Sequence, residues 1–384
     1  MIITNNCFLR FTSVLLIVFS ASLATAQGKY YPVNVSLWPE TLSLNKTKTD
    51  TASFNLSLLY TNIGKIKGVG IGLGYVVNNQ DMSGININAG LTKIGGRLNG
   101  LSLSALGNTS SKDVSGFQIA GFVNIANKNI KGAQMSGLIN YLIGDMTGAQ
   151  LSAVVNIAGS NVKGFQLGNS NIIGDNLTGV QIGTTFNAVS NKLKGVQIAP
   201  GNIAGDNYGG QAGVLNATGT NKGLQIGVVN IADYQYGIPV GIANIARKNG
   251  DIEWINYTSN FTLLNTGIKL NAGKFLSILE AGYDHYDSQD NASWTLGAHY
   301  GYDFDFAKYY KISPDIGYVE IFDSKKGDTE HEFALQGRLI GQVAFNKKIR
   351  FFAGLGYSHR FIINKTGEDI DEGKFLVLAG FSLF

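Results

Sequence analysis

The side chains of this 384-residue chain that could do acid–base or metal chemistry are few and lie near its C-terminus. The histidines all follow residue 280: His285, His299, His331 and His359. Glu330-His331-Glu332 has no second histidine at the spacing of zinc ligands, so we interpret it as solvated charge. Three acidic residues of the same region have no serine or histidine partner at a catalytic spacing: Glu280, Asp284 and Glu320. We therefore expect no enzyme activity, no metal site and no cofactor.

Side-chain amides are the polar groups that recur. Glutamines follow one another at Gln118, Gln134, Gln150, Gln166, Gln181 and Gln197, and continue at Gln211 and Gln225. Asparagines follow in step at Asn108, Asn124, Asn140, Asn156, Asn171, Asn187, Asn202, Asn216, Asn230 and Asn244. Such columns could form a glycan-binding face. We favour structural ladders, because an amide has both donors and acceptors and stacked amides satisfy one another.

Aspartates in the Gly-Asp turns, such as Asp145, raise a calcium reading. Calcium-binding nonapeptide repeats place an acidic ligand in nearly every coil, whereas only some turns here carry Asp and residues 67–250 contain no Glu. The glycines of 68–74 resemble a nucleotide loop only weakly, because they alternate and no helix follows. We therefore expect neither ligand.

The elements that carry the amides are repeats, and the repeat is marked by glycine. Seven glycines from Gly68 to Gly164 are 16 residues apart, and the series continues at Gly179, Gly195, Gly210, Gly223 and Gly237. Each copy holds two short apolar runs separated by small residues, which indicates two strands per coil and excludes helices. A coil this small has to stack on its neighbours to bury its apolar side chains.

We predict an all-β chain in which residues 67–250 form a β-solenoid, right- or left-handed, of about 12 coils of 14–16 residues. Adjacent copies should pair in parallel, with Asn124, Asn140 and Asn156 in one column. The rival is an antiparallel meander with one strand per copy, since about 15 residues also suits a barrel strand and its turn. We disfavour it because the copies lack aromatic belts.

The N-terminal 26 residues have the features of a secretory signal peptide. Arg10 precedes an apolar run, and Ala24-Thr25-Ala26 is a cleavage site of small residues. The single cysteine, Cys7, would leave with this segment, so the mature chain would have no thiol. Residues 27–66 read as a lead-in and solenoid cap. The net charge of +4 is too small to indicate nucleic acid as a partner.

The composition changes near residue 251. Residues 251–384 hold 24 aromatic side chains, against 9 in the longer segment 67–250, and their strands are long and alternating. We expect an antiparallel meander, an eight-stranded β-barrel, with strands near 252–259, 262–271, 275–285, 293–304, 309–321, 333–345, 349–361 and 374–384. Pro314 and Asp315 fit this pattern badly, because proline interrupts a sheet ladder.

Aromatic residues near both ends of these strands predict two belts at the membrane surfaces, so we expect outer-membrane lipid as a partner. Trp294, Phe333, Phe361 and Phe375 would form one belt, and Phe304, Tyr309, Phe345, Phe351 and Phe384 the other. Short turns near 272–274, 305–308 and 346–348 alternate with long loops near 286–292, 322–332 and 363–373. This alternation is typical of outer-membrane barrels, and it places residue 251 on the periplasmic side.

Two features resemble known proteins. The C-terminal Gly380-Phe381-Ser382-Leu383-Phe384 resembles the last-strand signal of outer-membrane barrels. The strings of Gly-x-Gln-apolar-small-x-x-Asn, from about Gly100 to Ala246, resemble the bacterial surface-repeat proteins of spirochaetes and Bacteroidota. The second resemblance implies a cell-surface or outer-membrane location and implies no catalytic residue. It favours a rod on the outside, in conflict with the loop alternation.

The pattern as a whole predicts a non-enzymatic outer-membrane or cell-surface repeat protein that reaches its place after Sec export. Its role would be structural or adhesive, with envelope or host macromolecules as partners. Two alternatives stay open: a small transport or pore accessory of the outer membrane, and a soluble secreted β protein. A small barrel filled by its own side chains argues against a pore.

Overall fold

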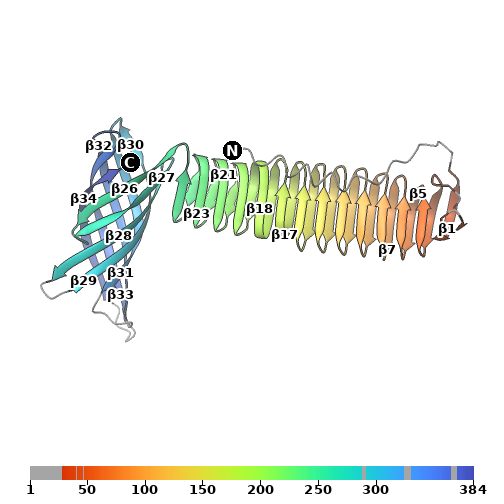
Figure 1. Cartoon of the computed structure of the whole chain (residues 1–384), viewed down its shortest axis with the longest axis horizontal. Coiled ribbons are helices and arrows are strands. Elements are labelled where there is room, and N and C mark those ends of the chain that lie inside the picture. The colour runs from red at the N-terminus through yellow and green to blue at the C-terminus, as the bar shows by residue number, and fades with distance from the viewer. Residues whose placement is uncertain (1–27, 40, 46, 288–290, 324–329, 365–369) are drawn as a thin grey trace.

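The structure is a computed structural model that describes residues 28–39, 41–45, 47–287, 291–323, 330–364 and 370–384. The expected signal peptide with Cys7, and most of the expected long loops, lie outside these residues. The described chain forms two β-sheets, and one of them is a long parallel stack while the other is antiparallel and closed. The predicted all-β class is therefore confirmed, with a β-solenoid of about 12 turns and an eight-stranded barrel (Figure 1).

Each solenoid coil consists of a longer and a shorter strand, as in β11 (Val114–Ala120) and β12 (Val123–Ala126). β11 pairs in parallel with β13 (Ile130–Ser136) of the next coil, and β12 pairs in parallel with β14 (Ile139–Leu142). Asn124 lies opposite Asn140, and Asn140 opposite Asn156. The parallel prediction is confirmed and the antiparallel meander is wrong for this part of the chain.

The first half of the solenoid contains β1 (Tyr30–Trp38), β2 (Leu42–Ser43), β3 (Thr51–Ser57), β4 (Tyr60–Ile63), β5 (Lys65–Gly72), β6 (Tyr75–Asn78), β7 (Met82–Asn88), β8 (Leu91–Ile94), β9 (Leu98–Ser104) and β10 (Gly107–Ser110). β1 pairs in parallel with β3, and β3 with β5. The parallel stack thus begins at β1, and the segment expected as a lead-in already contains coils.

The second half contains β15 (Met146–Ser152), β16 (Val155–Ala158), β17 (Val162–Ile173), β18 (Leu177–Ile198), β19 (Gly201–Asn207), β20 (Gly210–Ala212), β21 (Leu215–Asn221), β22 (Leu224–Ile226), β23 (Val229–Gln235), β24 (Ile238–Val240) and β25 (Ala243–Ala246). In β17 and β18 the two strands of a coil run together. In β18, and again from residue 201 on, the residues of the polar turn belong to the strands as well.

We call the two rims of the flattened coil the polar edge and the apolar edge. The polar edge is the turn that leads from the short strand into the next long strand, as at 127–129. The apolar edge is the turn from the long strand to the short strand, as at 121–122. The interior differs between them: beside the polar edge it holds an apolar core that includes Val114, Ala126 and Ile130, and beside the apolar edge it holds the buried amides.

The repeated glycines are required by backbone geometry. Eight of them, from Gly68 to Gly179, have φ between 118° and 147°, where other residues are strained. They also stack so closely that a Cβ at Gly132 would lie 1.9 Å from the carbonyl oxygen of Gly116. In the last coils the column passes through Gly195, Gly209, Gly223 and Gly237. The expected member Gly210 instead pairs with Val196 and Leu224, because the repeat shortens to 14 residues there.

The second sheet contains β26 (Gly250–Ser259), β27 (Leu264–Ala272), β28 (Phe275–Asp287), β29 (Asn291–Tyr302), β30 (Phe304–Ala307), β31 (Tyr310–Asp323), β32 (Glu330–Ala344), β33 (Ile349–Asn364) and β34 (Ile370–Leu383). Neighbours are antiparallel, and β26 pairs with β34 to close the barrel. Short β30, at an expected turn, pairs only with β31, so eight strands form the wall.

The barrel has a definite stagger. We follow the partner of each residue around the wall, starting at Trp254 in β26. The path passes through Ile268, Leu279, Ala298, Tyr318, Leu335, His359 and Gly373. The β26–β34 register, continued to Gly373, corresponds to position 264 on the line of β26, ten residues beyond the start. The shear is therefore ten residues for eight strands. With a rise of about 3.3 Å and a strand spacing of about 4.8 Å, it corresponds to a tilt of roughly 40°, within the usual range for closed barrels.

The two residues that fitted the expected barrel badly are accommodated in β31. Pro314 lies on the outer face of a continuous strand, and Asp315 lies on the inner face opposite Arg338. The expected strand near 309–321 is therefore present and continuous through both residues, and the side chain of Asp315 pairs with Arg338 in the lumen.

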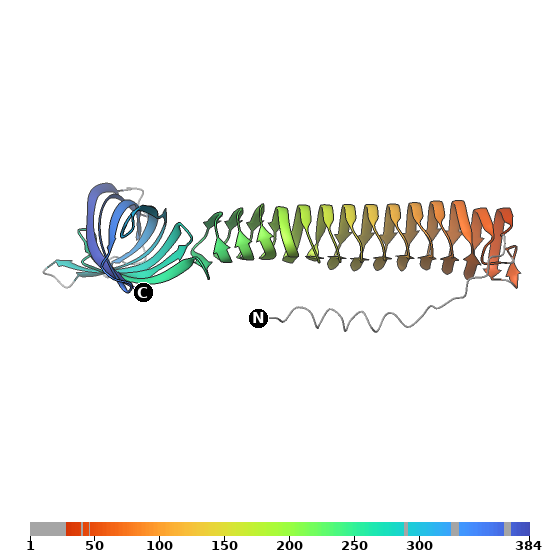
Figure 2. The same ribbon diagram turned by 90° about the horizontal axis from the view of Figure 1, so that it is seen from above.

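The rod leaves the barrel sideways, at the barrel end with the short turns (Figures 1 and 2). Asn244 Nδ2 in the last coil donates to Ser277 Oγ on the outer wall, at 2.6 Å. Gly273, in the turn between β27 and β28, lies against the Gln235 carbonyl, so closely that a Cβ there would be 2.4 Å from its oxygen. The last coil therefore packs against the barrel wall.

Candidate functional site

The buried amides form two continuous ladders. In the glutamine ladder each Nε2 donates to the Oε1 of the preceding coil, at 2.6–2.9 Å from Gln134 to Gln225. In the asparagine ladder each Nδ2 donates to the Oδ1 of the following coil, at 2.8–3.1 Å from Asn108 to Asn244. The amides in both ladders are at most 2% exposed. Such buried columns cannot serve as a glycan-binding face.

The glutamine ladder ends one coil before the asparagine ladder. Pro239 takes the next position in the glutamine column and lies opposite Gln225. Gln225 Oε1 is consequently buried without a hydrogen-bond partner among the described residues. The asparagine ladder instead continues to Asn244, whose amide is received by Ser277 of the barrel. The barrel wall thus caps one ladder and leaves the other open.

A third, exposed column runs along the polar edge and uses the aspartates of the turns. Asp145 Oδ1 accepts hydrogen bonds from Ser160 Oγ at 2.7 Å and from the backbone and side-chain nitrogens of Asn161 at 3.0 Å. These hydrogen bonds lower the pKa of the Asp145 carboxyl. The neighbouring coils repeat the arrangement with Asn129 and Asn176. The aspartate therefore replaces an asparagine as a turn acceptor, which accounts for its position without a metal.

The barrel lumen holds an ion network that sequence reasoning missed. Arg338 lies at its centre, with Nε 2.8 Å from Asp315 Oδ1 and Nη1 3.4 Å from both oxygens of Glu280. Tyr257 Oη donates to Glu280 Oε1 at 2.7 Å. His299 lies between the two acids, 3.0 Å from Glu280 and 3.3 Å from Asp315. All five side chains are buried.

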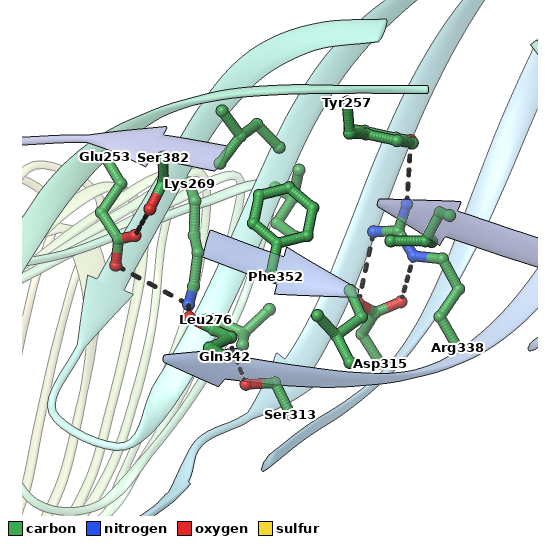
Figure 3. Close-up of a pocket in the computed structure, with 14 residues that line it drawn as sticks. Glu253, Tyr257, Lys269, Leu276, Ser313, Asp315, Arg338, Gln342, Phe352 and Ser382 are labelled. Carbon is green, nitrogen blue, oxygen red and sulfur yellow. Dashed lines mark hydrogen bonds and ion pairs between the residues drawn. The ribbon is translucent and has the colours of Figure 1, made fainter. Parts of the chain in front are cut away.

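A second cluster lies nearer the short-turn end of the lumen (Figure 3). Lys269 Nζ lies 3.7 Å from Glu253 and 3.5 Å from Asp303. Glu253 also accepts from Ser382 Oγ at 2.6 Å and from Arg350 Nη1 at 2.8 Å. Apolar side chains that include Leu276, Ile340 and Phe352 fill the space between the two clusters. The cavity that remains is about 20 Å³, room for the centre of about one water molecule.

The outer wall is apolar and carries aromatic residues at both ends. The predicted belt residues Trp294, Phe304, Phe345 and Phe384 are exposed on it, and Phe333 is half-buried because it stacks on Phe361 at 5.0 Å. Ten residues separate Trp294 from Phe304, and ten separate Phe351 from Phe361. At a rise of about 3.3 Å and a tilt of about 40°, the belts are roughly 25 Å apart along the barrel axis.

The structure places the other candidate residues on different faces. His331 and His359 lie on the outer wall beside Phe333 and Phe361, whereas His299 lies in the lumen. Glu320 lies on the outer face and pairs with His331 at 2.9 Å. The side chains of Asp284 and His285 lie outside the described residues. Both His299 and Arg338 are buried on the lumen face of their strands, β29 and β32.

Within the described ranges, no group of three or more His, Cys, Asp or Glu side chains is placed to hold a metal ion. In the same ranges no helix is long and apolar enough to cross a membrane. Comparison with protein families, curated proteins and solved structures found no match. The class of the molecule is therefore defined by its fold: a closed eight-stranded barrel that carries a β-solenoid.

Proposed function

We propose that this chain is a non-enzymatic outer-membrane protein, exported through the Sec pathway, whose barrel anchors a rod with a structural or adhesive role. Lipid is its first partner, and envelope or host macromolecules are the candidates for binding along the rod. No residue is assigned a catalytic role.

The observation that carries this proposal is the outer wall of the barrel. Leu296, Leu339 and Leu355 are more than half exposed on it, between the two aromatic belts. A spacing of roughly 25 Å matches the apolar band of outer-membrane barrels. A soluble β protein would expose this whole band to water, and exposed apolar patches of that size mark interaction surfaces. The wall therefore favours lipid over the soluble alternative.

The lumen weighs against the transport alternative. Arg338 with its acidic partners, and the apolar cluster beside them, occupy the cross-section that a conducting pore would need open. Eight-stranded barrels are in general just wide enough for side chains to fill. We expect no conductance when the protein is inserted in planar bilayers. A porin purified and inserted in the same way is the positive control.

Membrane extraction tests the proposal. The full chain, expressed with its own leader in a diderm bacterium, should remain with outer membranes after alkaline carbonate washing. It should also migrate faster in detergent gels before heating than after. Release by carbonate, or recovery in the periplasm, would contradict the proposal.

A matched pair of variants separates insertion from folding. Leu355 lies near the middle of the band, so Leu355→Arg should cost about 2–4 kcal/mol of insertion and reduce the membrane fraction. Lys374→Glu, at an exposed residue beside Glu372, should leave that fraction unchanged. Equal membrane fractions for both variants would show that lipid does not contact the wall at Leu355.

A further inference from the structure

Two different surfaces run along the length of the rod, one apolar and one charged. Along the apolar edge, large apolar side chains project outward and are 41–56% exposed: Leu106, Phe122, Leu138, Val154, Val214, Val228 and Ile242. The outward positions of the flanking strands are also mostly Ile, Leu, Val or Phe, as at Ile119 and Val123. This stripe is interrupted at Asn169 and at Thr184–Thr185, where β17 and β18 run through the edge.

Nearly all charge of the rod lies on the other edge. Residues 67–250 contain 12 Lys or Arg and 6 Asp, and only Lys93 among these 18 lies away from the polar edge and its first outward strand position. The polar edge is therefore basic, with an excess of five positive charges once Lys93 is set aside. A basic polar face opposite an apolar one is the pattern of elements that lie in a membrane interface.

The contacts with the barrel fix which way each edge faces. At the polar edge of the last coil, Gln235 lies against Gly273, which is in a short turn at the end of the barrel. Farther toward the apolar edge, Asn244 contacts Ser277, four residues along β28 from that turn. Along the barrel axis, the polar edge therefore lies at the short-turn end. The apolar edge, at Ile242, lies farther along that axis, at a level between the two aromatic belts.

The backbone of the apolar edge meets the requirement for contact with hydrocarbon. Its turn amides donate to the preceding coil: Gly121 N to Ser104 O at 3.1 Å, and Phe122 N to Leu106 O at 3.2 Å. The next coil repeats this with Leu138 N and Phe122 O at 3.0 Å. Unsatisfied amides are excluded from the bilayer core, and here coil-to-coil hydrogen bonds satisfy them.

We propose that the rod lies in the plane of the membrane, with its apolar edge immersed in the acyl chains of the leaflet on the short-turn side and its basic edge at the phosphate headgroups. This inference rests on the proposed insertion of the barrel. The contact between Asn244 and Ser277 brings the apolar edge of the rod next to the apolar band of the barrel. The apolar side chains of this edge lie on the outside of the coils, whereas the amides lie inside. The rod is therefore a lipid-binding surface and not a projecting stalk.

Cysteines that carry an environment-sensitive fluorophore, placed one at a time in a chain with Cys7→Ser, test this, because Cys7 is the only native cysteine. The variants are Phe122→Cys on the apolar edge, Lys128→Cys on the polar edge of the same coil, and Leu296→Cys on the barrel wall. The full chain is reconstituted in phosphatidylethanolamine–phosphatidylglycerol vesicles that contain lipids with nitroxide on the acyl chain. Iodide is the aqueous quencher.

We expect the labels at 122 and 296 to be quenched several-fold more by the acyl-chain nitroxide than the label at 128, and iodide to show the reverse order. Lipid quenching at 296 with iodide quenching at 122 would overturn the in-plane rod and leave the barrel anchor standing. Iodide quenching at both would overturn the barrel anchor itself. Protection of the label at 122 from both quenchers, increasing with protein density, would show that a second copy covers the edge, which also overturns the lipid assignment.

Discussion

Each buried amide of the ladders stabilises the rod through several hydrogen bonds. Asn140 accepts from Asn124 at 3.0 Å and donates to Asn156 at 2.9 Å and to the Leu151 carbonyl at 2.7 Å. Asn140→Leu removes these partners inside a dry interior, where a buried unsatisfied group costs about 1–3 kcal/mol. We expect a loss of stability of this order in thermal melts followed by circular dichroism. Asn127→Leu, on the exposed polar edge, is the control, and equal melting of the two variants would contradict the ladder's role.

The open end of the glutamine ladder offers the opposite change. Pro239→Gln would place an amide beside Gln225 Oε1, which lacks a partner in the described structure. One added hydrogen bond contributes about 1 kcal/mol, so the variant should melt above the wild type. Pro239→Ala separates the loss of proline from the gain of the amide. If both variants melt alike, the added amide does not complete the ladder.

The ion network of the lumen makes the barrel sensitive to substitution of Arg338. Arg338→Met leaves Glu280 and Asp315 buried without their main cation, and breaking such a group typically costs about 3–5 kcal/mol. The folded form in detergent gels should convert to the unfolded form at a lower temperature. Lys374→Met breaks an exposed pair with Glu372, which contributes little, and should leave that temperature unchanged. A shift of equal size in both variants would show that burial does not determine the effect.

At the scale of one element, the glycine column sets the coil spacing. Gly132 has φ of 139° and its Cβ position lies 1.9 Å from a carbonyl oxygen, so Gly132→Ala should destabilise the rod by more than about 1 kcal/mol. Gly210→Ala is the matched control, because its nearest neighbour within reach is Val196 Cγ2 at 4.0 Å. Urea unfolding of the two variants compares them directly. A Gly210→Ala variant that loses as much stability would refute the close-approach explanation.

Much of each element was predictable, for physical reasons that also define the limits. Identical residues at a fixed period can stack only in parallel register, so Asn124 and Asn140 were predicted to be neighbours. The strand ranges of the barrel followed from alternation. Asp315 was misread because its partner Arg338 lies on the neighbouring strand, and alternation within one strand does not give the register between β31 and β32. No repeat in the sequence predicts the contact between Asn244 and Ser277, because it joins the solenoid to the barrel.

At the scale of the whole molecule, the coil is the unit of construction. Deletion of 132–147 should bring Gln118 opposite Gln150 and Asn124 opposite Asn156, which preserves both ladders. We expect a folded, membrane-bound protein with one coil fewer. Deletion of 132–139, half a coil, should abolish the cooperative melt of the rod, because amides would face apolar residues. Equivalent melts for the two deletions would contradict the modular reading.

The opposed directions of the two ladders have a consequence for how this chain can change over time. Glutamine donates toward the N-terminus and asparagine toward the C-terminus, so their dipoles offset each other and an added coil introduces no growing field along the rod. Between Gln118 and Gln225 each coil offers the same pair of amides to its neighbours. Unequal recombination between the repeats of the gene would therefore yield longer or shorter proteins that fold without compensating mutations, and rod length becomes a trait that selection can adjust in steps of one repeat.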